Sequence, residues 1–362
     1  MARVTLQTIA DEVGVSRMTV SNAFSRPDQL SASLRDRILA VADKLGYSGP
    51  DPTARALVSG TAGAIGVVLS DALTYTLTDE VAMAFLAGIA EELGAGGRAL
   101  TLLPAAPEDG SMPARDVAID GAVVYSCHTD STAISWLLRR RLPTVFVDQA
   151  AAPGIPSVNV DDRSGARAAA QHLVELGHRS VGIVTTGFGG DFGVLPDVLA
   201  LPLANTERER LLGWTDALTA AGVTPTVVRL PHTDSQEIGY GGAQALLGLE
   251  RRPTGILCFS DAIAVGAISA IQDVGLDVPA DVSVVGFDDN PVARRGRPAL
   301  TTVRQDSQAK GRAAAGLLVA AIEKQRDADS HSGTNGHAKR SRHLVLPTEL
   351  VVRDSTAAPR RW

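Results

Sequence analysis

The stretch of the chain with the clearest local pattern is Ala10-Asp11-Glu12-Val13-Gly14-Val15-Ser16-Arg17-Met18-Thr19-Val20-Ser21-Asn22, which predicts two short helices joined by a tight turn. Gly14 can adopt positive φ at no steric cost, so the first helix is expected to end there. Ser16 can accept hydrogen bonds from the N–H groups that open the second helix. The apolar faces that pack the helices together are expected from Val13, Val15 and Val20. This pattern is typical of a helix-turn-helix, which lays its second helix in the major groove of DNA.

The remaining residues of the second helix are expected to face outward, and their chemistry suits DNA. Arg17 can donate two hydrogen bonds to the O6 and N7 atoms of guanine, Asn22 can form a bidentate pair with adenine, and Met18 can contact the methyl group of thymine. Thr19 and Ser21 suit phosphate oxygens, which position a protein without reading base sequence. An ordinary helical hairpin at the edge of a globular domain is the alternative, since turns of small residues with a serine cap are common.

The N-terminal sixty residues carry a wider resemblance. Residues 4–60 resemble the headpiece of the LacI/GalR family of bacterial transcription regulators, and the matching segments are Val4 to Ala10, Gly14 to Ser16, Thr19 to Ser21 and Leu45 to Tyr47. A third helix is expected from about Ser33 to Leu45, capped by Ser31. Its apolar face at helical spacing would consist of Leu34, Ile38, Val41 and Leu45.

The segment Pro50 to Leu57 resembles the hinge of that family, which becomes helical only when two subunits meet on operator DNA. By this likeness Leu57 would be an apolar wedge inserted between base pairs from the minor groove. The alternative is a plain linker, which the two nearby prolines also fit. The DNA-binding candidates from residue chemistry and resemblance together are Thr5, Ser16, Arg17, Met18, Thr19, Ser21, Asn22, Arg55 and Leu57.

Length and composition limit the classes of protein that fit. With 362 residues and 45% apolar content, the chain is expected to form more than one domain. No signal peptide and no run of membrane-spanning length is recognisable, so a cytoplasmic location and no membrane partner are expected. Cys127 and Cys258 are far apart and lack C-x-x-C spacing, so the sequence predicts no disulfide framework and no zinc site. No other metal and no cofactor is expected. Cys258 is expected to be a small buried apolar residue.

Charge by itself argues against DNA binding. The formal net charge is −6, and residues 1–59 hold seven Lys and Arg against six Asp and Glu, so the remainder carries about −7. Affinity for DNA would have to come from a few placed contacts and from two headpieces acting together.

From Ala64 onward the pattern changes to apolar strands alternating with amphipathic helices. Strands are expected at 64–69, 121–125, 144–147, 180–184, 255–259 and 282–286. Helices are expected at about 79–93, 165–176 and 263–274. This alternation predicts doubly wound α/β sheets, with ligands at the carboxyl ends of the strands.

The resemblance to the LacI/GalR family continues to the C-terminus and implies two α/β subdomains similar to periplasmic sugar-binding proteins. The local matches include Val160-Asp161-Asp162, Arg210 to Trp214, Ser260-Asp261, Gly286 to Asp289 and Leu346 to Arg353. The implied organisation is a small all-α headpiece at 1–48, a hinge at 49–60, and a core at 61–362. The core would comprise an N-subdomain, about 61–159 and 290–303, and a C-subdomain, about 160–289 and 304–362. Chain crossings are expected near 158–162, 287–291 and 301–306, which would make a hinge that closes on a ligand.

Several residues are candidates for lining the cleft between the subdomains. The resemblance implies Asp288 and Arg210 as contacts to ligand hydroxyls, and Asp148 and Ser260 as cleft positions. Asp71 and Tyr75 follow the first strand, where an aromatic ring could stack on a sugar or nucleoside. The alternatives are a cap or turn for Asp288, a solvated helix charge for Arg210, and a core residue for Tyr75. The effector-binding candidates are therefore Asp71, Tyr75, Asp148, Arg210, Ser260 and Asp288.

The chain departs from the family pattern in several segments. Only His232 and Asp234 stand where relatives carry an aromatic residue between Leu230 and Gly239, and Ser307 occupies another such position. An insertion at 187–203, rich in Gly and Pro, is expected to form a mobile flap beside the cleft. Its Gly187-Phe188-Gly189-Gly190 lacks the third glycine of a dinucleotide loop. Residues 323–343 are expected to form a disordered loop before the last strand.

These observations favour a DNA-binding transcriptional regulator, expected to be a repressor, controlled by a sugar or nucleoside-like effector and acting as a homodimer or tetramer on double-stranded operator DNA. Two other classes stay open: a solute-binding protein serving a transporter, and an α/β enzyme with a DNA module. Asp161-Asp162 and Asp288-Asp289 are paired carboxylates, but neighbours on a strand face opposite sides. Because no G-x-S-x-G, Walker loop or H-E-x-x-H occurs, catalysis is not expected.

Overall fold

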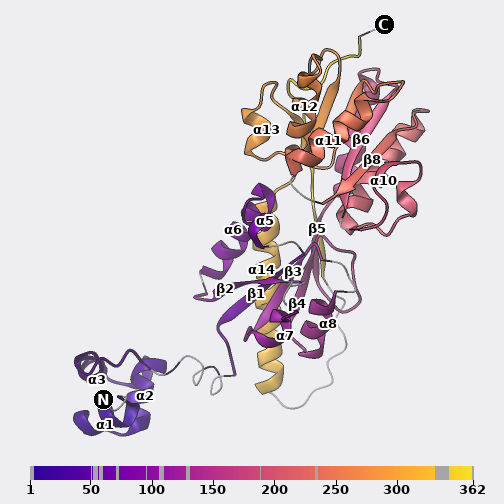
Figure 1. Ribbon diagram of the computed structural model, residues 1–362. Helices are drawn as coiled ribbons and strands as arrows, with labels where there is room; N and C mark the ends of the chain where they lie inside the picture. The colour runs from indigo at the N-terminus through magenta and orange to yellow at the C-terminus, as the bar shows by residue number, and fades with distance from the viewer. Residues whose placement is uncertain are drawn as a thin grey trace. The chain divides into compact units, whose positions relative to one another are not determined.

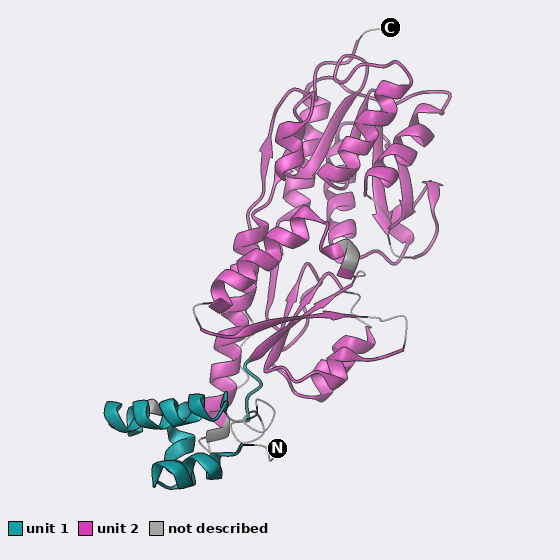
Figure 2. Cartoon of the chain, turned by 60° about the vertical axis from the view of Figure 1, so that its left-hand side comes forward, with its two compact units in different colours: residues 1–63 teal, residues 64–362 magenta. Residues whose placement is uncertain are grey.

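A computed structural model describes residues 4–49, 51, 56, 60–70, 73–94, 96–105, 110–127, 131–187, 189–232, 235–330 and 342–360. Contacts divide the chain into two compact units, Met1–Gly63 and Ala64–Trp362 (Figure 2). No helix among the described residues is long and apolar enough to cross a membrane.

The first unit is a three-helix domain whose helix ends match the sequence prediction. It contains α1 (Leu6–Val13), α2 (Arg17–Ser25), a 3-10 turn at Pro27–Gln29, and α3 (Ala32–Lys44). Gly14 ends α1 with φ of 75° and donates its N–H to the Ala10 carbonyl at 2.9 Å. The side chains of Ser16 and Ser31 accept hydrogen bonds at the N-termini of α2 and α3. The small core is formed by Ile9, Ala10, Val13, Val20, Ala23, Ile38 and Ala42.

The second unit contains two sheets, and we call each sheet with its helices a lobe. The first lobe has the strand order β12-β5-β4-β3-β1-β2, with all strands parallel. Its strands are β1 (Ala64–Leu69), β2 (Ala99–Pro104), β3 (Gly121–Tyr125), β4 (Thr144–Val147), β5 (Ser157–Val160) and β12 (His343–Leu346). Its helices are α5 (Leu73–Thr76), α6 (Glu80–Gly94), α7 (Pro113–Asp116), α8 (Thr132–Arg139) and α14 (Ser307–Ser330).

The second lobe has the strand order β13-β11-β10-β9-β6-β8-β7, in which only the outermost pairings, β11 with β13 and β7 with β8, are antiparallel. Its strands are β6 (Val181–Gly187), β7 (Gly193–Leu195), β8 (Thr226–Pro231), β9 (Gly255–Cys258), β10 (Ser283–Asp288), β11 (Thr301–Arg304) and β13 (Glu349–Val351). Its helices are α9 (Asp162–Glu175), α10 (Asn205–Ala220), α11 (Ser235–Leu247), α12 (Asp261–Asp273) and α13 (Pro291–Arg295), with a 3-10 turn at Val198–Ala200.

Each sheet has a hydrophobic core on both faces, which is why its strands are apolar along their whole length. In the second lobe α11 and α12 cover one face and α9 and α10 the other, while α6 and α14 cover a face of the first lobe (Figure 1). The predicted doubly wound fold is therefore confirmed, and Cys258 is buried in β9 as expected.

The chain crosses between the lobes at Asp161, at 305–306 and at 347–348. The first two crossings fall within predicted segments, but the crossing predicted near 287–291 is wrong. There β10 pairs with β11, and α13 stays against α12 because Ala293 is buried in the core of the second lobe. Residues 290–303 therefore belong to the second lobe. The assignment of 307–330 and 343–346 to the C-subdomain is also wrong, because Ala314 and Leu318 of α14 are buried in the core of the first lobe and β12 pairs with β5 in the first sheet.

Two segments expected to be loose are ordered where the structure describes them. The 187–203 insertion contributes β7 to the edge of the second sheet, and Val198 is buried in the core of that lobe. This part of the insertion is therefore an edge strand rather than a flap. The helix α14 continues to Ser330, so the predicted disorder from residue 323 is wrong at its start. Residues 331–341 lie outside the described part of the chain.

Candidate functional site

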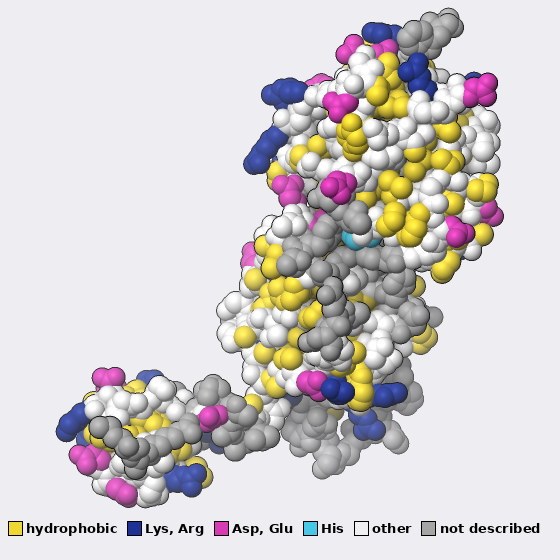
Figure 3. Space-filling model, viewed as in Figure 1, with side chains coloured by type: hydrophobic (Ala, Val, Ile, Leu, Met, Phe, Trp, Pro, Cys, Tyr) yellow, Lys and Arg dark blue, Asp and Glu magenta, His cyan; other side chains and the backbone are white. Residues whose placement is uncertain are grey.

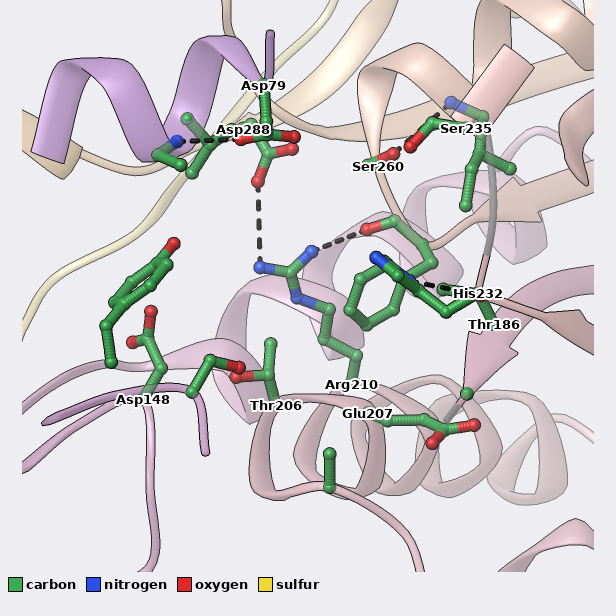
Figure 4. A pocket seen from close by; sticks show the side chains of 18 of the residues that line it. Asp79, Asp148, Thr186, Thr206, Glu207, Arg210, His232, Ser235, Ser260 and Asp288 are labelled. Atoms are coloured by element: carbon green, nitrogen blue, oxygen red, sulfur yellow. Dashed lines mark hydrogen bonds and ion pairs between the residues drawn. The ribbon is translucent and has the colours of Figure 1, made fainter. Parts of the chain in front are cut away.

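A pocket lies between the two lobes at the carboxyl ends of their strands (Figure 4). It contains about 930 Å³ of space free of protein atoms, including its open mouth. Tyr125 ends β3, Asp288 ends β10, and Thr186 lies near the end of β6. Parallel strands point their carboxyl ends the same way, so these residues from distant parts of the chain reach one cleft.

The guanidinium group of Arg210 occupies the centre of this pocket (Figure 4). Its Nε donates to Asp162 Oδ1 at 2.8 Å, its Nη1 donates to the Phe259 carbonyl at 2.5 Å, and its Nη2 lies 3.6 Å from Asp288 Oδ1. The planar group also lies 3.6 Å from the centroid of the Phe287 ring. Because Arg210 is only 4% exposed, these partners hold the charge in a fixed orientation rather than in water.

The Asp288 carboxylate is the second element of the site and is also buried. Its Oδ1 accepts a hydrogen bond from Gln305 Nε2 at 2.6 Å, and Gln305 lies on a crossing between the lobes. Burial raises the pKa of Asp288 to about 7, although the neighbouring Arg210 favours its ionised form. Burial raises the pKa of Asp162 in the same way, again against the effect of Arg210.

The next residue, Asp289, faces away from the pocket and behaves in the opposite way. Its buried carboxylate accepts hydrogen bonds from Arg304 at 2.8 Å, Arg353 at 2.5 Å and Arg294 at 3.1 Å. Although burial disfavours the charge, these three guanidinium groups hold the pKa of Asp289 below its usual value. Of the paired carboxylates 288 and 289, only Asp288 lines the pocket.

The backbone at the site is strained. Asp288 has φ of 117°, Asp148 has φ of 55° and Ser126 has φ of 53°, and all three line the pocket. Residues with a Cβ rarely adopt these φ values, and such backbone strain concentrates at ligand sites.

A second buried ion pair borders the pocket. Arg229 Nε donates to Glu207 Oε1 at 2.7 Å and Nη2 donates to Oε2 at 3.2 Å, and Glu207 lines the pocket. Arg229 also holds the insertion, because its Nη1 donates to the Gly189 carbonyl at 2.6 Å. A Cβ on Gly187 would lie 1.7 Å from Arg229 Nη2, so glycine is needed there.

The structure brings together four of the six predicted effector-binding residues, since Asp148, Arg210, Ser260 and Asp288 all line the pocket. The Ser260 hydroxyl also caps α12 by accepting from the Ile263 N–H at 3.2 Å. Asp71 and the side chain of Tyr75 lie outside the described part of the structure, as does Asp234. His232 lines the pocket.

Most other lining residues were missed by sequence reasoning, although many follow the same strand-end rule. The polar and aromatic ones are Thr76, Asp79, Tyr125, Ser126, Thr186, Thr206, Glu207, Ser235, Phe259 and Gln305. Tyr125 and Phe259 end predicted strands and Thr186 lies two residues beyond one, so all three could have been found from that position alone. Thr206 and Glu207 lie four and three residues before Arg210. Helical spacing puts them on the same face as Arg210, so they could have been found from that spacing.

In the first unit, the outward-facing residues predicted to contact DNA lie on or beside α2. Met18 is 69% exposed, and Arg17 is exposed beside it. Asn22 is partly exposed, and its Nδ2 donates to Gln29 Oε1 at 3.2 Å. The face shown in Figure 3 carries both basic and acidic side chains on this unit, in keeping with its small net charge.

Thr5 and Ser16 cap α1 and α2, and the Ser16 hydroxyl is hydrogen-bonded to that of Thr19 at 2.8 Å. Ser21 is partly exposed. Arg55 and Leu57 lie outside the described residues.

Comparisons with known proteins agree with this arrangement. Residues 5–49 match bacterial regulatory proteins of the lacI family, and residues 170–356 match the periplasmic binding protein-like domain. An HTH-type transcriptional regulator of Mycolicibacterium smegmatis is 40% identical over 332 residues, covering 87% of this chain and 90% of the relative.

Two solved structures show the same architecture. The Lac repressor dimer bound to operator and the anti-inducer ONPF has a TM-score of 0.77 and 26% identity, covering 99% of this chain and all of that one. The complex of the regulator CelR with cellobiose has a TM-score of 0.68 and 26% identity, covering 98% of this chain and all of that one. The chain therefore belongs to the LacI family of DNA-binding transcriptional regulators controlled by small-molecule effectors.

Proposed function

We propose that this regulator is a homodimeric repressor whose grip on its operator changes when a neutral, polyhydroxylated molecule binds in the pocket between the lobes. The observation that carries the proposal is the buried Arg210 between Asp162 and Asp288. A guanidinium fork can donate to ring or hydroxyl oxygens while carboxylates accept from hydroxyl groups, which is the chemistry of sugar recognition.

The charges around the pocket favour a ligand without an acidic group. Glu207 is paired with Arg229 and Asp148 with Lys310, while Arg210 faces both Asp162 and Asp288. Asp79 adds a further carboxylate to the lining. Acidic groups thus outnumber basic ones, so a phosphate or carboxylate would be repelled.

The proposed ligand is a sugar or a nucleoside-like molecule. The Phe259 ring lines the pocket and offers an apolar face to a sugar or nucleoside ring. Cellobiose in the CelR complex is an example of this ligand class in a relative.

On DNA, we propose that α2 of each headpiece lies in a major groove of a near-palindromic operator. Arg17, Met18 and Asn22 would read base edges, while Thr5, Ser16, Thr19 and Ser21 would contact phosphates. Arg55 and Leu57 would act in the hinge, with Leu57 wedged into the minor groove. If a change in the angle between the lobes parts the hinges, linkage requires that operator DNA weaken ligand binding by the same factor.

We further propose that the ligand is a signal and is not turned over. The carboxylates that line the pocket are each held by another group. Asp148 pairs with Lys310 and Glu207 pairs with Arg229, while Asp288 faces Arg210 and Asp79 accepts from the Ala82 N–H. General acid-base chemistry on a sugar requires two carboxyl groups facing the same bond.

The test combines ligand screening with operator binding. Melting temperatures are measured with sugars, polyols, nucleosides and their phosphates, because a ligand that binds the native state raises the melting temperature. Genomic fragments are then selected by the protein at moderate salt, and the screened ligand is added. Neutral sugars or nucleosides are expected to shift melting and to change operator affinity. Binding of the phosphates alone, or chemical conversion of the ligand, would contradict the proposal.

Asp288→Ala is expected to abolish the response to ligand while leaving operator binding intact, since Asp288 lies in the core and not in the headpiece. Asp354→Ala, which removes an exposed carboxylate from the same compact unit, is the matched control. A variant at 288 that still responds normally would remove this residue from the site.

A further inference from the structure

A buried lysine lies directly behind the pocket and contacts residues that line it. Lys310 is on α14 and is only 1% exposed. Its Nζ donates to Asp148 Oδ2 at 2.5 Å and to Gln305 Oε1 at 3.1 Å, and it lies 5.7 Å from the centroid of the Tyr125 ring. These three partners line the pocket, whereas Lys310 itself is not among the residues that line it.

We infer that Lys310 is a positioning residue for ligand recognition, which fixes the direction of the hydrogen-bonding groups that Asp148 and Gln305 present to the ligand. The inference rests on the proposed function of the pocket. An ammonium group can only donate hydrogen bonds, so every partner of Lys310 must turn an acceptor toward it.

For Gln305 the consequence is a fixed amide orientation. Because Oε1 faces Lys310, the Nε2 group faces the other way and donates to Asp288 Oδ1 at 2.6 Å. A continuous hydrogen-bonded path therefore runs from α14 of the first lobe, through the crossing at 305, to Asp288 in the second lobe. Asp288 in turn faces Arg210 across 3.6 Å.

For Asp148 the consequence is an open acceptor. Lys310 takes Oδ2, while Oδ1 is buried and has no hydrogen-bond partner among the described residues. Asp148 is 8% exposed and Lys310 holds Oδ2, so Oδ1 cannot turn into solvent without breaking this contact. A buried acceptor without a partner is costly, and a ligand hydroxyl that donates to it would remove that cost.

The test removes the ammonium group and keeps an unbranched side chain close to the length of lysine. Lys310→Met removes all donors, Lys310→Gln retains a neutral donor, and Lys324→Met makes the same change at an exposed position of the same helix. Circular dichroism first establishes that each full-length variant is folded at the temperature used. Calorimetric titrations then use ribose, glucose, cellobiose and uridine.

We expect Lys310→Met to weaken binding of the sugar or nucleoside that the wild type binds by about tenfold or more, since preorganisation of both partners is lost. Lys310→Gln is expected to fall between this variant and the wild type, and Lys324→Met to bind as the wild type does.

The measurement that separates positioning from general destabilisation uses single-deoxy analogues of the bound compound. In the wild type, removing the hydroxyl that meets Asp148 should weaken binding by about tenfold. Lys310→Met should bind the deoxy analogue almost as well as it binds the parent compound, because the substitution and the deoxygenation remove the same interaction.

Additive losses, or a Lys310→Met variant that binds within about twofold of the wild type, would overturn the inference and leave the proposed function standing. If the wild type binds none of the four probes, the neutral-ligand proposal fails, and the inference fails with it.

Discussion

The headpiece and the pocket are built in opposite ways. In the headpiece, Ser16 accepts from the Thr19 N–H three residues away, and the candidate DNA-reading side chain of Met18 is exposed. In the pocket, Lys310 meets Asp148 across 162 residues of sequence, and both side chains are buried. The DNA-binding surface of the headpiece is therefore held by local contacts and is exposed. The pocket is formed by residues that only the complete fold brings together.

This contrast separates binding from stability. Exposed side chains on α2 contribute little to folding, so their loss should affect only the complex with DNA. Buried charges of the pocket are held by other buried charges, so their removal should affect both folding and ligand binding.

The largest effect is expected from Arg210→Met. This change leaves Asp162 and Asp288 buried without their shared cation, which should cost about 3 to 5 kcal/mol of stability and abolish ligand binding. Unfolding in guanidinium chloride, followed by tryptophan fluorescence to which the buried Trp214 of the same lobe contributes, measures the loss of stability.

Arg208→Met is the control for that experiment, because Arg208 is exposed on the same helix. Its cost should stay within about 0.5 kcal/mol. Equal losses at 208 and 210 would mean that the pocket charges are solvated like surface charges, and the contrast with the headpiece would disappear.

The next effect is a pH dependence with opposite signs at two adjacent residues. The pKa of Asp288 is raised to about 7, so between about pH 4 and pH 7 the folded state holds a proton that the unfolded state has released. Its contribution to stability is therefore present at low pH and is lost as the pH rises toward 7. Asp288→Asn should remove this decline, so the variant gains stability relative to the wild type between pH 5 and pH 7.5.

Asp289→Asn should show the reverse. The folded-state pKa of Asp289 is lowered, so its contribution is present above the unfolded pKa near 4 and is lost as the pH falls through the lower folded value. Urea unfolding of both variants and the wild type at pH 3, 5 and 7.5 gives, for each variant, the slope of its change in unfolding free energy against pH. Slopes of the same sign would show that the two carboxylates do not differ as their surroundings indicate.

The same contrast explains what the sequence could predict. The three headpiece helices follow from caps and spacing, because Gly14, Ser16 and Ser31 act on residues within one turn of themselves. The buried strands follow from apolar runs. Arg210 and Asp288 were found only through family resemblance, since nothing local distinguishes them from a helix charge and a turn residue.

What could not be predicted depends on contacts between distant segments. The partition of residues 290–346 between the lobes is set by the core that buries Ala293 of α13 and by the core that buries Ala314 and Leu318 of α14. Nothing in the sequence of either helix identifies that core. Lys310 was missed because a lysine in an amphipathic helix is normally a solvated charge; only the position of Asp148 beside it shows otherwise. The insertion was misjudged because its anchor, Arg229, lies outside it.

A smaller effect is expected from Asn22→Ala. A bidentate contact to adenine would be lost, which should cost about 1 to 3 kcal/mol on the selected operator and relax one base position, with little change on unrelated DNA. Gln29→Ala is the matched variant, because Gln29 accepts a hydrogen bond from the Asn22 amide. If Gln29→Ala loses as much operator affinity as Asn22→Ala, or if unrelated DNA is affected equally, Asn22 does not read a base.

The smallest effect should come from Ser16→Ala. The Ser16 hydroxyl accepts from the Thr19 N–H at 3.0 Å, and loss of such a cap costs about 1 kcal/mol. Hydrogen exchange of the full-length protein should show faster exchange in α2, whereas Ser25→Ala, at the other end of the same helix, should leave its exchange unchanged. Faster hydrogen exchange confined to residues 6–44 would show that the local contacts of the headpiece also set its stability. Faster exchange at the pocket strands β9 and β10 would show instead that the two regions open together, and a site made of local contacts would then owe its stability to the whole fold.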